Sequence, residues 1–345
     1  MEKLKRYDSA MVIGKFMPLH KGHKRLIDFA RCNAHTTTVL VLGHKNEYIP
    51  LALRKKWMDE EYKGVPQMFI YGIDYDENEL NSSSESDRKS SIEWAKFLMY
   101  YINLHGIDVI IGSEKYVQYM AEYLGIDYII YDEERKNINI SATDIKKDVI
   151  KNWDYLTPAA KRYFAQHVCI CGTESTGKTT VCREMEDKYE YVTMIPEIGR
   201  CLVGNASTCS ENTLRNVFEI HRDLLNRVLI DPPTPIVIWD TDNITTLSYY
   251  AFLFKQKMYV YNVPLANKYF FFEPTIPYQK DVTRLDQNVA LDLRDSHLNM
   301  YKEFDISPTI IDRLRKETVE NYIKETMTEI SKKISGNELN KDKEE

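Results

Sequence analysis

The stretch AMVIGKFMPLHKGH, residues 10–23, joins an apolar run to a loop that contains glycine, proline and two histidines. Its first part, Ala10–Gly14, is apolar throughout, which is typical of a strand covered on both faces of a parallel sheet. A helix is expected from about Gly22 to Ala34. Strand, loop and helix in this order form the repeating unit of a doubly wound α/β fold.

The rest of the chain repeats this alternation of apolar runs and helical patterns. Further strands are expected at 37–43, 67–73, 107–113 and 127–132, and then at 167–172, 191–195, 235–240, 268–273 and 307–312. Helices are expected at 51–62, 92–104, 114–124 and 211–230. We therefore predict two doubly wound α/β domains, 1–152 and 167–334, with a connector at 153–166 and a disordered tail at 335–345.

The composition argues against several classes of protein. The 345 residues are 43% hydrophobic and 28% charged, which is typical of a soluble globular protein. A net charge of −6 argues against nucleic-acid binding through a basic surface, and no apolar run reaches the roughly 20 residues of a membrane helix. The N-terminus lacks an apolar signal segment, and the six cysteines lack a paired zinc spacing. We expect a cytoplasmic protein that binds neither nucleic acid nor membrane; a homo-oligomer stays open.

The loop GKFMPLHKGH, residues 14–23, is suited to a polyphosphate. A helix N-terminus presents unpaired N–H groups and partial positive charge, where phosphate binds readily. His20 and His23 lie on the first turn and can donate hydrogen bonds to phosphate oxygens, and Lys15 adds a point charge. Small Gly22 lets phosphate oxygens approach the backbone. The alternative is a structural turn in which the histidines are polar caps.

The stretch GTESTGKTT, residues 172–180, has the spacing GxxxxGK[ST] of a phosphate-binding loop between a strand and a helix. Lys178 would contact the β and γ oxygens of ATP, and Thr179 would hold Mg²⁺. A glycine-rich turn without a ligand is the alternative. The residues expected to bind ATP here are Gly172, Thr173, Glu174, Ser175, Thr176, Gly177, Lys178, Thr179 and Thr180.

Acidic residues follow the next strands of the second half. Asp240 ends the run PIVIWD, where the carboxylate that shares Mg²⁺ with Thr179 is expected. Asp240 and Asp242 are both expected to contact substrate, although an acid after a strand also commonly caps the next helix. Glu197, in the run PEIGR, is placed to accept a proton from a substrate hydroxyl or to bind a ribose. Arg200 is a candidate phosphate contact; a surface ion pair with Glu197 is the alternative.

Four side chains are candidates for substrate contacts on less specific grounds. Arg284 and Arg294 follow the fourth strand of the second half, where small-molecule kinases of this fold carry a lid. Arg54, in the run YIPLALRKKW, is a candidate for the second substrate of the first half, and Trp57 for stacking on a base. The alternatives are solvated helix charges for the arginines and core packing for the tryptophan.

Two motifs of the first half resemble those of the nucleotidyltransferase superfamily. GKFMPLHKGH is similar to the signature GxFxPxHxGH, and ISATDIKKD, residues 140–148, is similar to ISxTxIR. An ordinary helix cap is the alternative for the second motif. Lys146 stands where the superfamily usually has arginine. The positive charge is therefore kept, but the paired hydrogen bonds that a guanidinium group can donate are lost. The resemblance implies catalytic roles for both histidines and ATP contacts by Gly14, Lys15, Phe16, His20, Gly22, His23, Ser141, Thr143 and Lys146.

Five motifs in order (GKFMPLHKGH, SATDIKKD, GTESTGKTT, PEIGR and WDTDNITT) resemble the bifunctional nicotinamide-nucleotide adenylyltransferase and nicotinamide riboside kinase family of the NadR type. The resemblance implies a Rossmann-like nucleotidyltransferase domain followed by a P-loop kinase domain. The kinase would phosphorylate nicotinamide riboside with ATP and Mg²⁺. The other domain would join nicotinamide mononucleotide (NMN) to AMP from a second ATP, giving NAD and pyrophosphate. Little sequence precedes the first strand, so the DNA-binding domain of some members is not expected.

Two other functions stay open. A pantetheine-phosphate adenylyltransferase fused to a dephospho-coenzyme A kinase would have the same domain order, and the run DTDNITT argues against it. A nucleotide sensor that binds without turnover is the second. Lys146 is the one motif-level hint of a sensor, whereas Lys178, Thr179 and Asp240 argue against it. A substrate panel and turnover assays separate these functions.

Overall fold

The computed structural model describes residues 7–78, 80, 87–134, 136–204, 209–275, 287–312 and 316–336. The chain divides into two compact units, residues 1–160 with 332–345, and residues 161–331. Each unit has a five-stranded parallel sheet, which confirms the predicted α/β fold class. The exact limits of the predicted domains, connector and tail stay a prediction, and residues 337–345 of the tail lie outside the described residues.

The first unit contains β1 (Tyr7–Gly14), α1 (Lys21–Asn33), β2 (Ala34–Gly43), α2 (Leu51–Glu61), β3 (Met68–Asp74), α3 (Arg88–Phe97), α4 (Met99–Leu104), β4 (Val109–Gly112), α5 (Tyr116–Leu124), β5 (Asp127–Ile130), α6 (Ala142–Lys147) and the 3₁₀ turn η1 (Trp153–Tyr155). The helix α7 (Pro158–Phe164) spans the boundary between the units. The single helix expected at 92–104 is two helices, because Leu98 (φ −87°, ψ 0°) leaves the helical conformation.

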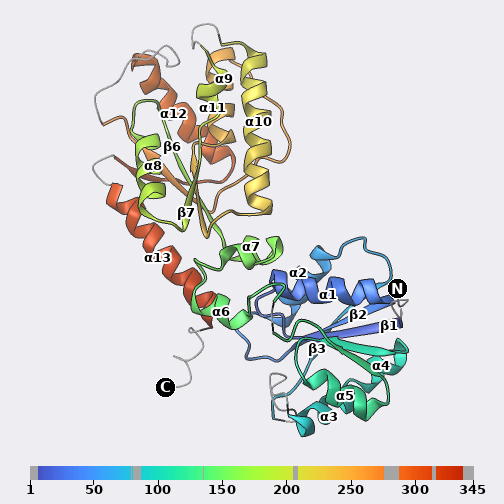
Figure 1. The fold of residues 1–345 in the computed structure, drawn as a ribbon. Coiled ribbons are helices and arrows are strands. Elements are labelled where there is room, and N and C mark those ends of the chain that lie inside the picture. Colours follow the sequence, from blue (N-terminus) through green and yellow to red (C-terminus); the bar gives the residue numbers. More distant parts are fainter. Residues whose placement is uncertain are drawn as a thin grey trace. The chain divides into compact units, whose positions relative to one another are not determined.

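The sheet of the first unit has the strand order β3-β2-β1-β4-β5. Successive residues of a strand point to opposite faces, and Met11 and Ile13 of β1 pack with Trp94 of α3 and Met120 of α5. Figure 1 shows α1 and α2 along the other face. The order reverses its direction between β1 and β4, and ligands of such sheets bind beyond the carboxyl ends of the strands at this point.

The second unit contains β6 (Gln166–Gly172), α8 (Lys178–Lys188), β7 (Val192–Ile195), α9 (Gly199–Leu202), α10 (Glu211–Ile230), β8 (Ile236–Asp240), α11 (Asn243–Phe254), β9 (Lys268–Phe272), α12 (Gln287–Glu303), β10 (Thr309–Ile311) and α13 (Lys316–Ser335), whose last residues group with the first unit. Its strand order is β10-β9-β6-β8-β7. The loop after the central strand β6 therefore leaves the sheet between β8 and β9.

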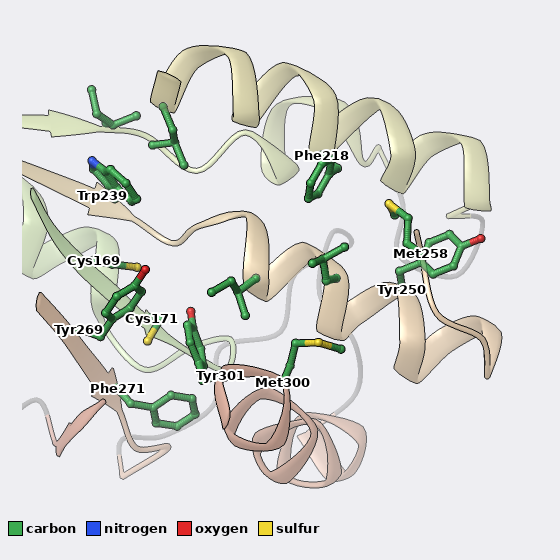
Figure 2. Packing of buried hydrophobic residues seen from close by; sticks show 14 of the residues in the cluster. Cys169, Cys171, Phe218, Trp239, Tyr250, Met258, Tyr269, Phe271, Met300 and Tyr301 are labelled. Carbon is green, nitrogen blue, oxygen red and sulfur yellow. The ribbon is translucent and has the colours of Figure 1, made fainter. Parts of the chain in front are cut away.

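One hydrophobic core of the second unit lies between its sheet and the helices α10, α11 and α12. Figure 2 shows Trp239 of β8 and Phe271 of β9 on the sheet side, with Phe218 of α10 and Tyr301 of α12 facing them. All four side chains are fully buried. Cys169, on β6, packs in the same cluster. This core holds the carboxyl ends of β6 and β8 at fixed positions.

Candidate functional sites

A cavity of about 510 Å³ lies at the carboxyl end of the first sheet. Every residue predicted to contact ATP in this half lines it: Gly14, Lys15, Phe16, His20, Gly22, His23, Ser141, Thr143 and Lys146. They come from the end of β1, the start of α1 and the helix α6. The fold therefore brings together two motifs that lie at opposite ends of the unit's sequence, while their contact with ATP stays a prediction.

His20 is the N-cap of α1. Its Nδ1 accepts hydrogen bonds from the backbone N–H groups of Gly22 (3.1 Å) and His23 (3.3 Å). Because Nδ1 is the acceptor, the proton of the neutral ring lies on Nε2. The His23 ring stacks on the His20 ring with centroids 3.6 Å apart, and a Cβ at Gly22 would lie 2.9 Å from the His20 ring. The absence of a side chain at Gly22 thus leaves space for the His20 imidazole. Capping uses Nδ1 of His20, and Nε2–H is a hydrogen-bond donor.

A buried acid holds Lys15 beside this cavity. Glu47 Oε1 lies 3.0 Å from Lys15 Nζ, and its Oε2 accepts from the Arg54 guanidinium. Burial, the largest single effect, lowers the pKa of Lys15, but hydrogen bonds with Tyr75 and Glu47 outweigh it and raise that pKa above its ordinary value. Lys15 therefore keeps its charge. Sequence reasoning missed Glu47, since no motif marks it.

Arg54 and Trp57 are both buried, and their contacts with substrate stay predictions. Arg54 is no solvated helix charge: it is fully buried and donates to the backbone carbonyls of Lys15, Leu42 and Ile49. These hydrogen bonds support the loop that carries Lys15. Trp57 is 2% exposed and belongs to the core, which argues against stacking on a base.

The second motif begins α6 with a capping box. Ser141 Oγ accepts from the Asp144 N–H (3.1 Å), and Asp144 Oδ2 accepts from the Ser141 N–H (2.9 Å). The Lys146 ammonium lies 5.0 Å from the centroid of the Tyr48 ring. Burial lowers the pKa of Lys146 and the charge of Lys15 lowers it further, whereas the charge of Glu47 raises it. Lys15 and Lys146 both line the cavity and lie within electrostatic reach of each other, an arrangement that favours a polyanion.

The loop between β6 and α8 has the backbone of an anion-binding nest. Gly172 (φ 125°), Ser175 (φ 58°) and Gly177 (φ 88°) have positive φ angles, which turn successive N–H groups toward a common centre. The Thr173 carbonyl accepts from Thr176 Oγ1 (3.0 Å) and from Lys178 Nζ (2.7 Å), so side chains of the loop hold it closed. The described geometry thus suits the predicted phosphate contacts.

Replacing Gly172 by alanine is expected to lower the free energy of unfolding by about 3 kcal/mol or more, because strain and overpacking add. The new Cβ would lie 2.5 Å from the Phe272 carbonyl oxygen, at a φ of 125°. Gly125→Ala is the matched control, since Gly125 has φ 70° but nothing within 4 Å of a Cβ. The control should cost about 1–2 kcal/mol. Urea unfolding of both variants measures the difference, and equal losses would contradict the close approach.

Thr179 and Asp240 lie in contact, with Thr179 Oγ1 donating to Asp240 Oδ2 at 2.6 Å. Asp240 is 1% exposed, and its Oδ1 has no hydrogen-bond partner among the described residues. Burial raises the pKa of Asp240, whereas the nearby charge of Lys178 lowers it. A hydroxyl beside a buried carboxylate fits Mg²⁺, which takes few protein oxygens and completes its shell with phosphate and water. The described residues include no cluster of three or more His, Cys, Asp or Glu that could bind a metal without such partners.

A second cavity lies beside this loop. Its polar lining includes Glu174, Lys178, Glu197 and Arg200, and α10 and α11 contribute much of the remainder. Glu197 and Arg200 form the ion pair anticipated as their alternative, with Arg200 Nε 2.8 Å from Glu197 Oε2. Both charges also act on the pKa of Asp240, which places them near the Thr179–Asp240 pair. Glu197 and Arg200 can therefore form an ion pair with each other and also lie at the candidate kinase site.

Asp242 is a helix cap, the alternative named for it, and its contact with substrate stays a prediction. Its Oδ1 accepts from the Thr245 N–H (2.9 Å) and from the Tyr301 hydroxyl (2.8 Å), and it is 1% exposed. Arg294 of α12 pairs with Glu273, with Nε and Oε2 2.8 Å apart, and neither Asp242 nor Arg294 lines the second cavity. The predicted role of Arg294 at a transferring phosphoryl group thus gains no support, and Arg284 lies outside the described residues.

Sequence reasoning also missed residues of the second cavity. His221 of α10 and Thr245, Thr246 and Tyr249 of α11 line it. His221 occupies a core-facing position of an amphipathic helix, a signal that the sequence already contains. The two threonines follow the run DTDN in the sequence and lie on α11. No spacing rule distinguishes the buried face of such a helix from a face that contacts substrate.

The fold and the nest after β6 define a P-loop α/β protein, and a family model described as an AAA domain matches residues 167–321. The chain is similar, in particular, to the trifunctional NAD biosynthesis/regulator protein NadR. It is 24% identical over 206 residues to NadR of Salmonella typhimurium (strain LT2) and 27% identical over 202 residues to NadR of Escherichia coli (strain K12). Each match covers 55% of this chain and 48% of the relative, so the chain spans about half the length of these curated relatives.

The crystal structure of NadR protein in complex with NR is a structural relative. It has a TM-score of 0.50 and 19% sequence identity, and the match covers 90% of both chains. At this identity the likeness is one of fold. The similarity to NadR in sequence agrees with the resemblance that the motifs predicted, and the structure adds the shared fold. Within the described part of the chain, no helix has the length and hydrophobicity needed to cross a membrane.

Proposed function

We propose that the protein is a bifunctional enzyme of NAD salvage. The second unit phosphorylates nicotinamide riboside to NMN with ATP, and the first unit converts NMN and a second ATP to NAD and pyrophosphate. One observation carries the proposal: a single chain holds a stacked histidine pair in a basic cavity and a nest followed by the Thr179–Asp240 contact. The similarity to proteins named for NAD biosynthesis supports this choice of substrates.

In the kinase reaction, the 5′-hydroxyl oxygen attacks the γ-phosphorus of ATP, the bond to the β,γ-bridging oxygen breaks, and ADP leaves. Glu197 would accept the hydroxyl proton, because its carboxylate lines the cavity near Asp240. Lys178 and the N–H groups of the nest would neutralise the phosphate oxygens. Thr179 and Asp240 would hold Mg²⁺, which supplies further charge neutralisation when bound.

In the adenylyl transfer, a phosphate oxygen of NMN attacks the α-phosphorus of ATP, the bond to the α,β-bridging oxygen breaks, and pyrophosphate leaves. The side chains need only orient the reactants and stabilise charge. The Nε2–H of His20 and the ring of His23 would donate to phosphate oxygens as negative charge develops. Lys15 and Lys146, which line the same cavity, would add positive charge.

The test is product analysis of the purified protein with ATP, Mg²⁺ and nicotinamide riboside. We expect NAD, ADP and pyrophosphate. NMN without NAD would support the kinase alone and overturn the assignment of the first unit, where Lys146 departs from the motif. Turnover of phosphopantetheine or dephospho-coenzyme A in place of nicotinamide riboside would favour the coenzyme A enzymes. Nucleotide binding without any turnover would favour the sensor.

Replacing His20 by alanine is expected to lower adenylyl transfer by roughly 10²–10³-fold, the effect of one lost charge-stabilising donor. His20→Asn separates the two roles of this residue, because asparagine is also a good N-cap but lacks the Nε2–H. The measurement is the initial rate of NAD formation from NMN and ATP. His35→Ala, at an exposed position of β2, is the control and should leave the rate unchanged. If the Asn variant were fully active, His20 would serve only as the N-cap of α1 and the proposed donor role would be wrong.

A further inference from the structure

The helix α10 carries a histidine where its pattern of buried positions favours an apolar side chain. Its buried face consists of Leu214, Val217, Phe218, His221 and Leu225, the spacing of a core-facing stripe. His221 is 1% exposed, and its Nε2 is buried with no hydrogen-bond partner among the described residues. Buried polar atoms in folded proteins almost always have a partner. A ligand that reaches this position would supply the missing partner.

His221 is part of the lining of the cavity beside the P-loop, so a ligand bound in this cavity would lie against its side chain. The polar lining from Lys178, Glu197 and Arg200 contains the groups assigned above to phosphoryl transfer. The lining from α10 and α11 includes the aliphatic Leu214, Val217 and Leu253 and the aromatic Tyr249. Aliphatic and aromatic walls suit a flat heteroaromatic ring, and a buried imidazole among them fixes its orientation through one polar substituent.

The imidazole is neutral under ordinary conditions, since burial lowers the pKa of His221 to about 4. A neutral imidazole has one nitrogen that donates and one that accepts. A carboxamide has both an acceptor oxygen and a donor N–H₂ group, so it can pair with Nε2 in either tautomer of the ring. The nicotinamide ring of the proposed substrate carries this substituent.

We propose that His221 is a specificity-determining residue of the kinase site, whose Nε2 hydrogen-bonds the ring carboxamide of nicotinamide riboside. The proposal rests on the proposed function, which supplies the identity of the nucleoside. It assigns the ring to the α10–α11 side of the cavity and the 5′-hydroxyl to the side of Glu197 and Lys178.

The test compares kcat/KM for nicotinamide riboside with that for pyridinium riboside, the same nucleoside without the carboxamide. We expect the wild-type protein to favour nicotinamide riboside by roughly 10–100-fold, because a site built around a hydrogen bond rejects the analogue that lacks it. His221→Leu should bring this ratio to within about threefold of unity by lowering kcat/KM for nicotinamide riboside alone. His221→Gln, which keeps a hydrogen-bonding amide, should recover part of the ratio, and KM for ATP should not change.

The matched control is His167→Leu. His167 of β6 is also buried, and its Nδ1 has no hydrogen-bond partner among the described residues. Burial lowers the pKa of His167 to about 4, as it does for His221. His167 does not line the cavity. Its variant should keep the wild-type ratio of kcat/KM values, whatever its effect on stability. A merely structural role of His221 would likewise leave that ratio unchanged.

Failure of the inference and failure of the proposed function give different results. If the wild-type protein does not phosphorylate nicotinamide riboside, the proposed function is wrong and the inference falls with it. If the wild-type protein phosphorylates both nucleosides at similar kcat/KM, the kinase stands and the inference is overturned, whether or not the variants fold. A folded Leu variant with the wild-type ratio overturns it too. If the Leu variant does not fold, His221→Phe, which keeps a planar apolar ring, is measured in its place.

Discussion

Replacing Lys178 by alanine is expected to lower NMN formation by at least about 10³-fold, because the loop loses the cation assigned to the β and γ oxygens of ATP. Lys178 Nζ already lies within the loop, 2.7 Å from the Thr173 carbonyl oxygen. NAD formation from supplied NMN should stay near the wild-type rate, because the histidine cavity belongs to the other compact unit. Separate assays, with nicotinamide riboside and with NMN as substrate, measure the two activities in one preparation.

Lys188→Ala is the control for this variant. Lys188 ends the same helix, and its Nζ pairs with Glu320 at 2.7 Å with a side chain that is 53% exposed. Its loss removes a lysine of α8 without touching the nest, so both activities should be kept. If Lys178→Ala abolished both activities while remaining folded, the assignment of one reaction to each unit would be wrong.

Replacing Glu197 by glutamine is expected to lower kcat of the kinase by roughly 10²–10⁴-fold if the carboxylate is the general base. Glutamine keeps the shape of the side chain but cannot accept the proton of the 5′-hydroxyl. In the structure Glu197 is paired with Arg200 at 2.8 Å, so the base is held at the cavity before substrate arrives. The measurement is kcat and KM for nicotinamide riboside, determined separately for the variant and the wild-type protein.

The control for Glu197→Gln is Glu219→Gln. Glu219 also pairs with an arginine three residues further on, Arg222, but it lies on α10 and does not line the cavity. Its loss should leave kcat and KM unchanged. A Glu197→Gln variant with a higher KM and an unchanged kcat would make Glu197 a ribose contact, and the identity of the proton acceptor would then be open.

The strands of both sheets could be predicted because each is a short apolar run bounded by polar residues. The expected runs at 167–172 and 235–240 contain β6 and β8 almost residue for residue. Helix ends were less predictable. The break at Leu98 depends on packing, because this fully buried residue belongs to a cluster with Trp94 and Ile102. Periodicity along the chain does not contain that information.

The candidate sites could be predicted only where a motif is local. The loops at 14–23 and 172–180 carry their geometry in consecutive residues, and both line cavities. The structural partners of Arg54 and Asp242 could not be predicted, because each is a charged residue near a motif. What decides their roles is burial and the partners that the fold provides: backbone carbonyls and Glu47 for Arg54, Thr245 and Tyr301 for Asp242.

The sequence by itself determined the strand–loop–helix units and the chemistry of the two phosphate-binding motifs, because these depend on the order and spacing of neighbouring residues. Only the tertiary structure decided which charges are structural and which line a cavity. It also placed the buried imidazole of His221 beside the catalytic candidates Lys178 and Glu197. The physical reason is that burial and hydrogen-bond satisfaction are set by residues far apart in the chain, which come together only when the sheet and its helices pack.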